Sequence, residues 1–304
     1  MPKKSVKVLR ILNLLFVMIL TLLIVGCNDE VVDDYVEVNL CPYCKKCNDK
    51  NCTHCTDKCE CEELQYEVSS FKILEGKDTE TVGYIYSTNK EGPKIAIVGG
   101  THGDEVAGWS AALRLKESLV EEIAFQGTVL LIPQVNILAD NAKVRYKVSG
   151  YDFSDLNRSF PLGRYSSAKD ATIELSTAVV SVIEEFDPDY IIDLHESLHS
   201  WDYMENGVKT SLGNTIIASN NPRFINQLIR RYNNDYKLEG EIDFRREEAT
   251  QLGSFNYYFT NTYPDKVVFT VETNRNEDKA LLENRIRQQL NILKALFDLA
   301  WDRI

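Results

Sequence analysis

Several residue types are absent from long parts of this 304-residue chain. No cysteine follows Cys61, so all eight cysteines belong to an N-terminal region separate from the rest. Basic residues are outnumbered, 34 to 46, and the formal charge of −12 argues against a nucleic-acid partner, because non-specific binding to phosphates depends on cations. Apolar residues make up 44%, enough for a sizeable core, which excludes a wholly disordered chain.

The first 26 residues contain no acid and no apolar run of membrane-spanning length. Four basic residues precede the apolar run 11–25, which is shorter than the ~20 residues a spanning helix needs. This is the pattern of a secretory signal peptide, residues 1–26. The run ends in Ile-Val-Gly-Cys, which resembles a bacterial lipobox and implies diacylation of Cys27. An uncleaved anchor helix is the alternative, and in both cases we expect the rest to be extracytoplasmic and anchored to the cell membrane.

Residues 27–40 are acidic and show no helix or strand pattern, so we expect a tether. Residues 41–61 form a cysteine-rich module, and its seven cysteines are Cys41, Cys44, Cys47, Cys52, Cys55, Cys59 and Cys61. Their two-residue gaps are typical of structural zinc sites, for which His54 would be an eighth ligand. A small secreted segment also favours disulfides, although seven is odd. Both interpretations stay open, and neither makes the module catalytic.

Residues 62–304 alternate β-rich runs with amphipathic stretches, which predicts one α/β domain with a mixed, mostly parallel central sheet flanked by helices. Glu272 directly follows the last predicted strand. The predicted strands are 81–87, 94–98, 128–133, 190–194, 215–218 and 266–271. The predicted helices are 105–122, 168–186 and 277–301.

Histidine is scarce, yet two of the four histidines follow predicted strands. His102 and Glu105 come after the apolar run and glycines of 95–100, and His195 follows the run 190–194. Ligands collect beyond the carboxyl ends of strands in open α/β sheets. Two imidazoles and a carboxylate are three legs of a tetrahedral zinc site that keeps one position open for catalysis. The spacing therefore predicts one catalytic zinc.

Four motifs now resemble a known family. His-Gly-Asp-Glu (102–105), Asp-Leu-Asn-Arg-Ser-Phe-Pro (155–161), Asp-Leu-His-Glu (193–196) and Phe-Thr-Val-Glu (269–272) occur in the order found in zinc carboxypeptidases and the related succinylglutamate desuccinylases and aspartoacylases. The resemblance covers about residues 80–304. It implies a zinc carboxypeptidase-like fold and a hydrolase that acts on an amide bond.

The resemblance also implies roles for individual residues. His102, Glu105 and His195 would bind zinc, and Asp155 would orient a ligating histidine. The general base would be Glu272; capping of the next turn is its plain structural alternative.

Three more residues match positions that contact substrate in the family. Asn157 and Arg158 would bind a substrate carboxylate, for which a guanidinium is suited. Arg145 would polarise the scissile carbonyl, although its surroundings depart from the family's usual Asn-Pro-Asp-Gly. Phe255 and Asn256 fall near the position that sets side-chain preference.

The sequence defines the substrate less closely than it defines the site residues. Only one amphipathic helix is predicted after Glu272, which favours a compact carboxypeptidase similar in size to murein peptide amidases over a deacylase with an extra domain. Together with the expected location, this predicts a cell-wall peptide or another small peptide with a free carboxylate. An N-acyl amino acid deacylase and an inactive binding or scaffold lipoprotein are the alternatives.

Overall fold

The computed structural model describes residues 36–38, 64–121, 123, 125–148, 150, 154–275 and 281–301. Cys27 and the cysteine module 41–61 lie outside these residues, as does the first of two compact units, Met1–Asp33. The second unit, Asp34–Ile304, contains every element described below.

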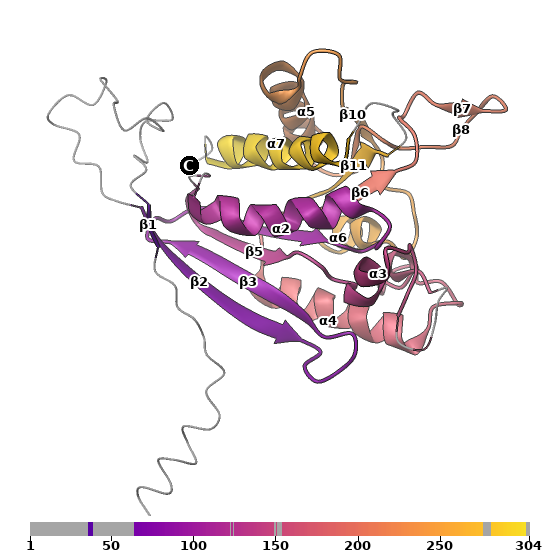
Figure 1. The fold of residues 1–304 in the computed structure, drawn as a ribbon, viewed down its shortest axis with the longest axis horizontal. Helices are drawn as coiled ribbons and strands as arrows, with labels where there is room; N and C mark the ends of the chain where they lie inside the picture. Colours follow the sequence, from indigo (N-terminus) through magenta and orange to yellow (C-terminus); the bar gives the residue numbers. More distant parts are fainter. Residues whose placement is uncertain are drawn as a thin grey trace, which may run out of the picture. The chain divides into compact units, whose positions relative to one another are not determined.

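A nine-stranded sheet is the centre of this unit, in the order β1-β2-β3-β5-β4-β6-β11-β9-β10 (Figure 1). The strands β5, β4, β6 and β11 are mutually parallel, whereas β1, β2 and β3 add antiparallel pairings at one edge. The mixed sheet with a parallel centre confirms the predicted fold class. The sheet strands are β1 (Val36–Val38), β2 (Leu64–Ile73), β3 (Thr81–Thr88), β4 (Lys94–Gly99), β5 (Thr128–Ile132), β6 (Tyr190–Ser197), β9 (Thr215–Ile217), β10 (Arg245–Glu247) and β11 (Val267–Asn274).

Helices cover both faces of the sheet (Figure 1). On one face α2, α5 and α7 pack in a core that includes Ile95 and Ile97, and on the other α4 and α6 pack with Ala96 and Val98. Because β4 is buried on both faces, its sequence is continuously apolar. The helices are α2 (Val106–Glu121), α3 (Ile137–Ala142), α4 (Asp170–Phe186), α5 (Pro222–Arg231), α6 (Phe255–Thr262) and α7 (Leu282–Trp301), with short helices η1 (Leu156–Arg158) and η2 (Tyr232–Tyr236).

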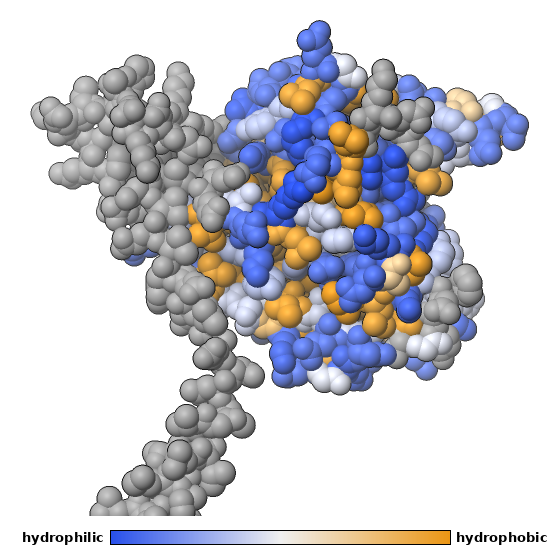
Figure 2. Space-filling view, viewed as in Figure 1, coloured by the Kyte–Doolittle hydropathy of each residue, from blue (hydrophilic) through white to orange (hydrophobic). Residues whose placement is uncertain are grey.

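The surface is more polar than these two core layers. On the face shown in Figure 2, exposed apolar side chains are interspersed with hydrophilic ones. A separate hairpin of β7 (Met204–Glu205) and β8 (Val208–Lys209) projects from the body (Figure 1). Among the described residues, no helix has the length and apolarity that crossing a bilayer requires.

Several boundaries differ from the sequence predictions, among them the start of the last helix, which is Leu282 rather than residue 277, and two strand ends at the site. Strand β6 runs on to Ser197 and β11 to Asn274, so His195 and Glu272 lie inside strands rather than after them. Both predictions stopped where the apolar run gave way to polar side chains, although the backbone pairing continues. In addition, Val36–Val38, inside the expected tether, pairs with β2 as an edge strand.

Candidate active site

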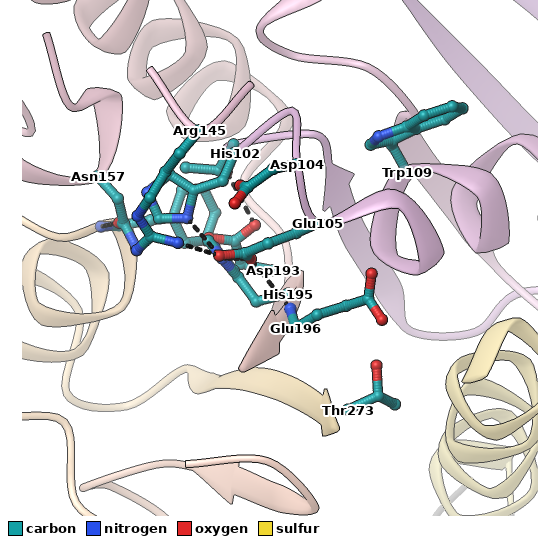
Figure 3. A network of polar contacts seen from close by, with 12 residues as sticks. His102, Asp104, Glu105, Trp109, Arg145, Asn157, Asp193, His195, Glu196 and Thr273 are labelled. Atoms are coloured by element: carbon teal, nitrogen blue, oxygen red, sulfur yellow. Dashed lines mark hydrogen bonds and ion pairs between the residues drawn. The ribbon is translucent and has the colours of Figure 1, made fainter. Parts of the chain in front are cut away.

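Three buried side chains converge where β4 and β6 end (Figure 3). His102 and Glu105 lie in the turn between β4 and α2, and His195 lies on β6. Glu105 Oε1 is 2.9 Å from His102 Nδ1, and Glu105 Oε2 is 2.6 Å from His195 Nδ1. One candidate ligand atom from each residue lies within 4.8 Å of the others. The structure thus brings together the three predicted metal ligands.

The turn that carries His102 and Glu105 depends on Gly103. A Cβ atom at this position would be 2.0 Å from the carbonyl carbon of Ala139 and 2.5 Å from the backbone nitrogen of Asp140. Because both atoms are backbone of α3, no side chain could move aside to make room. Glycine therefore lets the turn and α3 pack in contact.

The outer nitrogens of both imidazoles meet carboxylates. His102 Nε2 is 2.9 Å from Asp155 Oδ1, and His195 Nε2 is 2.7 Å from Asp193 Oδ2. The Thr101 hydroxyl donates to the second oxygen of Asp193 at 3.1 Å. A carboxylate on the outer nitrogen places the proton there and leaves Nδ1 as the ligand atom. Asp155 is where the sequence predicted it, whereas Asp193 was not assigned a role.

Electrostatics at this cluster favour a cation. Burial lowers the pKa of His195, but Asp193 and Glu105 outweigh it, so that its pKa lies well above the ordinary value. The pKa of His102 is also raised, since Glu105 and Asp155 outweigh burial. Burial raises the pKa of Glu105, yet the two imidazoles bring it well below the ordinary value. Two imidazole nitrogens and a carboxylate form a common ligand set of catalytic zinc, and these residues fit Zn²⁺.

Glu272 lies directly beside this cluster. It is paired in register with His195 across the parallel strands β11 and β6, so both side chains are on the same face of the sheet. Burial, followed by the charge of Glu105, raises the pKa of Glu272 to about 8. A carboxylate with a raised pKa next to a metal-binding group is suited to proton transfer.

Arg145 also reaches the cluster. Its Nη1 pairs with Glu105 Oε1, and its Nε donates to the Tyr146 hydroxyl at 3.0 Å. Burial lowers the pKa of Arg145, but the Glu105 charge and the hydrogen bond with Tyr146 outweigh it and raise this pKa, so Arg145 stays cationic. Its cation therefore lies on the cavity lining beside a candidate metal ligand.

Asn157 and Arg158 come from η1. Asn157 Oδ1 accepts the Phe255 backbone N–H at 2.8 Å, so the group it can offer a ligand is its NH₂. Arg158 donates through Nη1 to the Asn157 carbonyl at 2.6 Å, and its guanidinium is 5.9 Å from the Tyr165 ring centre. Both of these groups are uncharged, and the Arg158 charge also acts on Asp155, whose pKa is lowered despite burial by His102 and Arg158.

One cavity of about 890 Å³ joins most of these groups. It is lined by the three candidate ligands, by Glu272, Arg145, Asn157 and Arg158, and by the polar segment 247–251. Asn256 also lines it, where its Nδ2 donates to the Ile217 carbonyl and the Thr270 hydroxyl. Phe255, in contrast, is 1% exposed and belongs to the core beneath α6.

Some neighbours of the site were missed from the sequence. Arg275 donates through Nη1 to the Asp104 carbonyl and carboxylate at 2.8 and 2.9 Å, which ties the end of β11 to the turn between His102 and Glu105. The role of Asp193 could have been predicted from the sequence, because residues two apart on a strand, such as Asp193 and His195, share a face. Arg275 could not, since its partner is distant in sequence.

Known proteins resemble parts of this chain. Residues 91–219 match the family model described as the succinylglutamate desuccinylase/aspartoacylase catalytic domain. A curated relative, N-alpha-acetyl-L-2,4-diaminobutyric acid deacetylase of Halomonas elongata, is 35% identical over 105 residues, which are 34% of this chain and 29% of the relative. The chain thus spans less than a third of that relative's length.

Solved structures share the fold. Csd4 of Helicobacter pylori in its mDAP-bound form, described as a D,L-carboxypeptidase, has a TM-score of 0.54 at 18% identity, covering 68% of this chain and 50% of that one. Carboxypeptidase A of Helicoverpa armigera has a TM-score of 0.57 at 14% identity, covering 77% and 69%. Residues 91–219 thus resemble a succinylglutamate desuccinylase/aspartoacylase catalytic domain, and the chain shares the fold of the two carboxypeptidases, with a His/Glu/His group that could hold a metal ion.

Proposed function

We propose that this protein is a zinc-dependent hydrolase that cleaves an amide bond in a small peptide with a free carboxylate, a cell-wall peptide in the first place. One observation carries the proposal: Glu272 lies beside His195 in the same cavity as Arg158 and Asn157. The cavity therefore combines a site for water activation with a site for an anion.

His102, Glu105 and His195 would hold the zinc ion, with Asp155 and Asp193 fixing the two imidazoles. When bound, zinc supplies Lewis acidity that polarises a carbonyl and makes water a better nucleophile. Glu272 takes a proton from the attacking water and passes it to the leaving amine. Its position in register with His195 places one carboxylate beside the metal ligands for both transfers.

Arg158 and Asn157 would hold the carboxylate of the leaving part. The Arg158 guanidinium can form two parallel hydrogen bonds with a carboxylate, which fixes its orientation as well as its position. The Asn157 NH₂ adds a neutral donor, because its oxygen is engaged by Phe255. This orientation would direct the scissile carbonyl toward Glu272 and the metal ligands.

A peptide substrate is supported by the shared fold with Csd4, described as a D,L-carboxypeptidase, and by the predicted export of the chain. A second candidate is an N-acyl amino acid deacylase. The catalytic-domain match and the deacetylase relative favour it. Both reactions would use the same ligands and the same base, and they differ in the part of the substrate that carries the carboxylate.

An assay of the full chain separates these candidates. Cell-wall tripeptides and N-acetyl amino acids are offered in parallel, with and without a zinc chelator. We expect chelator-sensitive release of the terminal amino acid from the tripeptides, and loss of at least ~100-fold in rate for Glu272→Gln with unchanged zinc content. Hydrolysis of the acetyl substrates alone would select the deacylase. Bound zinc without any hydrolysis would favour a binding protein.

We also propose that Cys27 is lipidated and anchors the enzyme outside the cytoplasm. The support is the lipobox-like Ile-Val-Gly-Cys after a basic and apolar leader. Replacement of Cys27 by Ser should move the protein from the membrane to the soluble fraction of its host cell. Unchanged membrane association would favour the uncleaved anchor helix. The cysteine module keeps its two interpretations, structural zinc or disulfides.

A further inference from the structure

Glu196 follows His195 on β6 but points to the opposite face of the sheet. Ile192 and Leu194 belong to the core under α2 and α7, and Glu196 continues this alternation. In Figure 3 its carboxylate extends away from the His195 imidazole. Its side chain is 0% exposed, so its carboxylate is buried behind the metal-binding group.

Two contacts link Glu196 to the metal ligand Glu105. The Glu196 backbone N–H donates to Glu105 Oε2 at 2.9 Å. In return, Glu196 Oε2 accepts the backbone N–H of Ala107, two residues after Glu105, at 2.7 Å. The main chain of Glu196 therefore contacts the Glu105 carboxylate. The side chain of Glu196 contacts the main chain just after Glu105.

The contact with Ala107 is at the N-terminus of α2, which begins at Val106. The first backbone N–H groups of a helix have no partner inside the helix, and a carboxylate there also interacts favourably with the helix dipole. Glu196 is thus an anchor for the first turn of α2. The turn that carries His102 and Glu105 leads directly into that anchored helix.

Arg285 on α7 compensates the buried charge. Its Nε donates to Glu196 Oε1 at 2.6 Å, and its side chain is 14% exposed. One turn further along α7, Gln289 donates to the His195 carbonyl at 2.7 Å and to the Thr273 hydroxyl at 3.1 Å. Helix α7 therefore contacts the strands of the site from behind, next to His195 and next to Glu272.

We propose that Glu196, held by Arg285, is a positioning residue that fixes the Glu105 carboxylate for metal binding by anchoring the start of α2. This inference rests on the proposed metal site. An ion pair that served only stability would be replaceable by any uncharged pair of similar volume, since removal of both buried charges is often neutral for stability. A positioning role requires, in addition, that an acceptor for the Ala107 N–H is kept.

Two double variants of the full chain separate these roles. Glu196→Gln with Arg285→Met removes both charges but keeps an oxygen for the Ala107 N–H. Glu196→Leu with Arg285→Met removes both charges and the acceptor. Zinc affinity is measured by competition with a chelator, and the zinc retained by His102→Ala is subtracted as the contribution of other sites. Melting temperatures are measured on the same samples.

We expect the Gln/Met variant to stay within about threefold of the wild-type zinc affinity, and the Leu/Met variant to bind zinc about 10- to 100-fold more weakly. The melting temperatures of the two variants should lie within roughly 5 °C of one another. Glu283→Gln is the matched control. It removes the exposed ion pair with Arg114, which joins α7 to α2, and it should leave zinc affinity unchanged.

Equal zinc affinity of the two double variants would overturn the positioning role. A loss of zinc affinity that follows the melting temperature in every variant would also overturn it. If the wild type holds no more zinc than His102→Ala, the proposed function itself fails, which is a different outcome from either of these.

Discussion

His195 and Glu272 lie side by side on the adjacent parallel strands β6 and β11, paired in register and directed to the same face of the sheet. This relationship places a candidate metal ligand next to a candidate general base without any contribution from a flexible loop. Sites built on strands hold their geometry more closely than sites on loops. The predictions below follow from this arrangement and its supports.

Asp193 and Asp155 should strengthen metal binding without touching the metal. Replacement of either by Asn keeps the shape but removes the charge beside the imidazole Nε2. We expect zinc affinity to fall about 10- to 100-fold in each variant, because the histidine is less basic and less firmly oriented. Chelator competition measures this directly. Asp170→Asn, an exposed residue at the start of α4, is the control, and equal affinity in all three variants would contradict the role.

Arg158 should determine affinity for the substrate carboxylate. Replacement by Gln removes a charge-assisted hydrogen bond, so we expect KM to rise about 10- to 100-fold with a smaller change in kcat. A substrate whose carboxylate is converted to an amide should show no further loss in the variant. Arg164, in the segment that follows η1 and outside the cavity lining, is the matched control. A similar effect of Arg164→Gln would argue for a general loss of loop structure.

Asp140 should make stability depend on pH. Its carboxylate is 1% exposed behind Gly100, and burial raises its pKa to about 8. The unfolded chain loses this proton near pH 4, whereas the folded chain keeps it to about pH 8. Through this group the free energy of unfolding therefore falls as pH rises between these values.

Replacement of Asp140 by Asn should remove this contribution. Between pH 5 and pH 8, we expect the free energy of unfolding of the variant to rise relative to that of the wild type by on the order of 3 kcal/mol. This is roughly half of the free energy that corresponds to the full pKa difference. Urea unfolding at both pH values gives the result. The exposed Asp78→Asn should show no such pH-dependent gain, and a constant difference for Asp140→Asn at both pH values would contradict the account.

Much of the parallel centre could be predicted from the sequence, because strands such as β4 and β5 are buried on both faces and read as short apolar runs. The structure also brings His102, Glu105 and His195 together, as the sequence predicted. The ends of β6 and β11 could not be predicted from apolarity, since Glu196 and Thr273 are buried but polar. Their burial depends on partners in α7 that are distant in sequence.

Helices α5 and α6 were missed for different reasons. Helix α5 carries readable signals, with Pro222 in its first turn and Phe224, Ile225, Leu228 and Ile229 on its buried face. Helix α6 is rich in aromatic residues, which favour strands, and tertiary packing of Phe255 and Phe259 outweighs that preference. The contacts of Arg275 and Arg285 bridge segments far apart in the chain and needed the structure.

The central claim is that His102, Glu105 and His195 hold one catalytic zinc ion. The most direct test is the zinc content of the full chain and of His102→Ala, purified in parallel and analysed by elemental analysis. The account predicts that the wild type carries about one more zinc ion per chain than the variant, since three protein ligands complete such a site. Equal zinc content in the two proteins would contradict it.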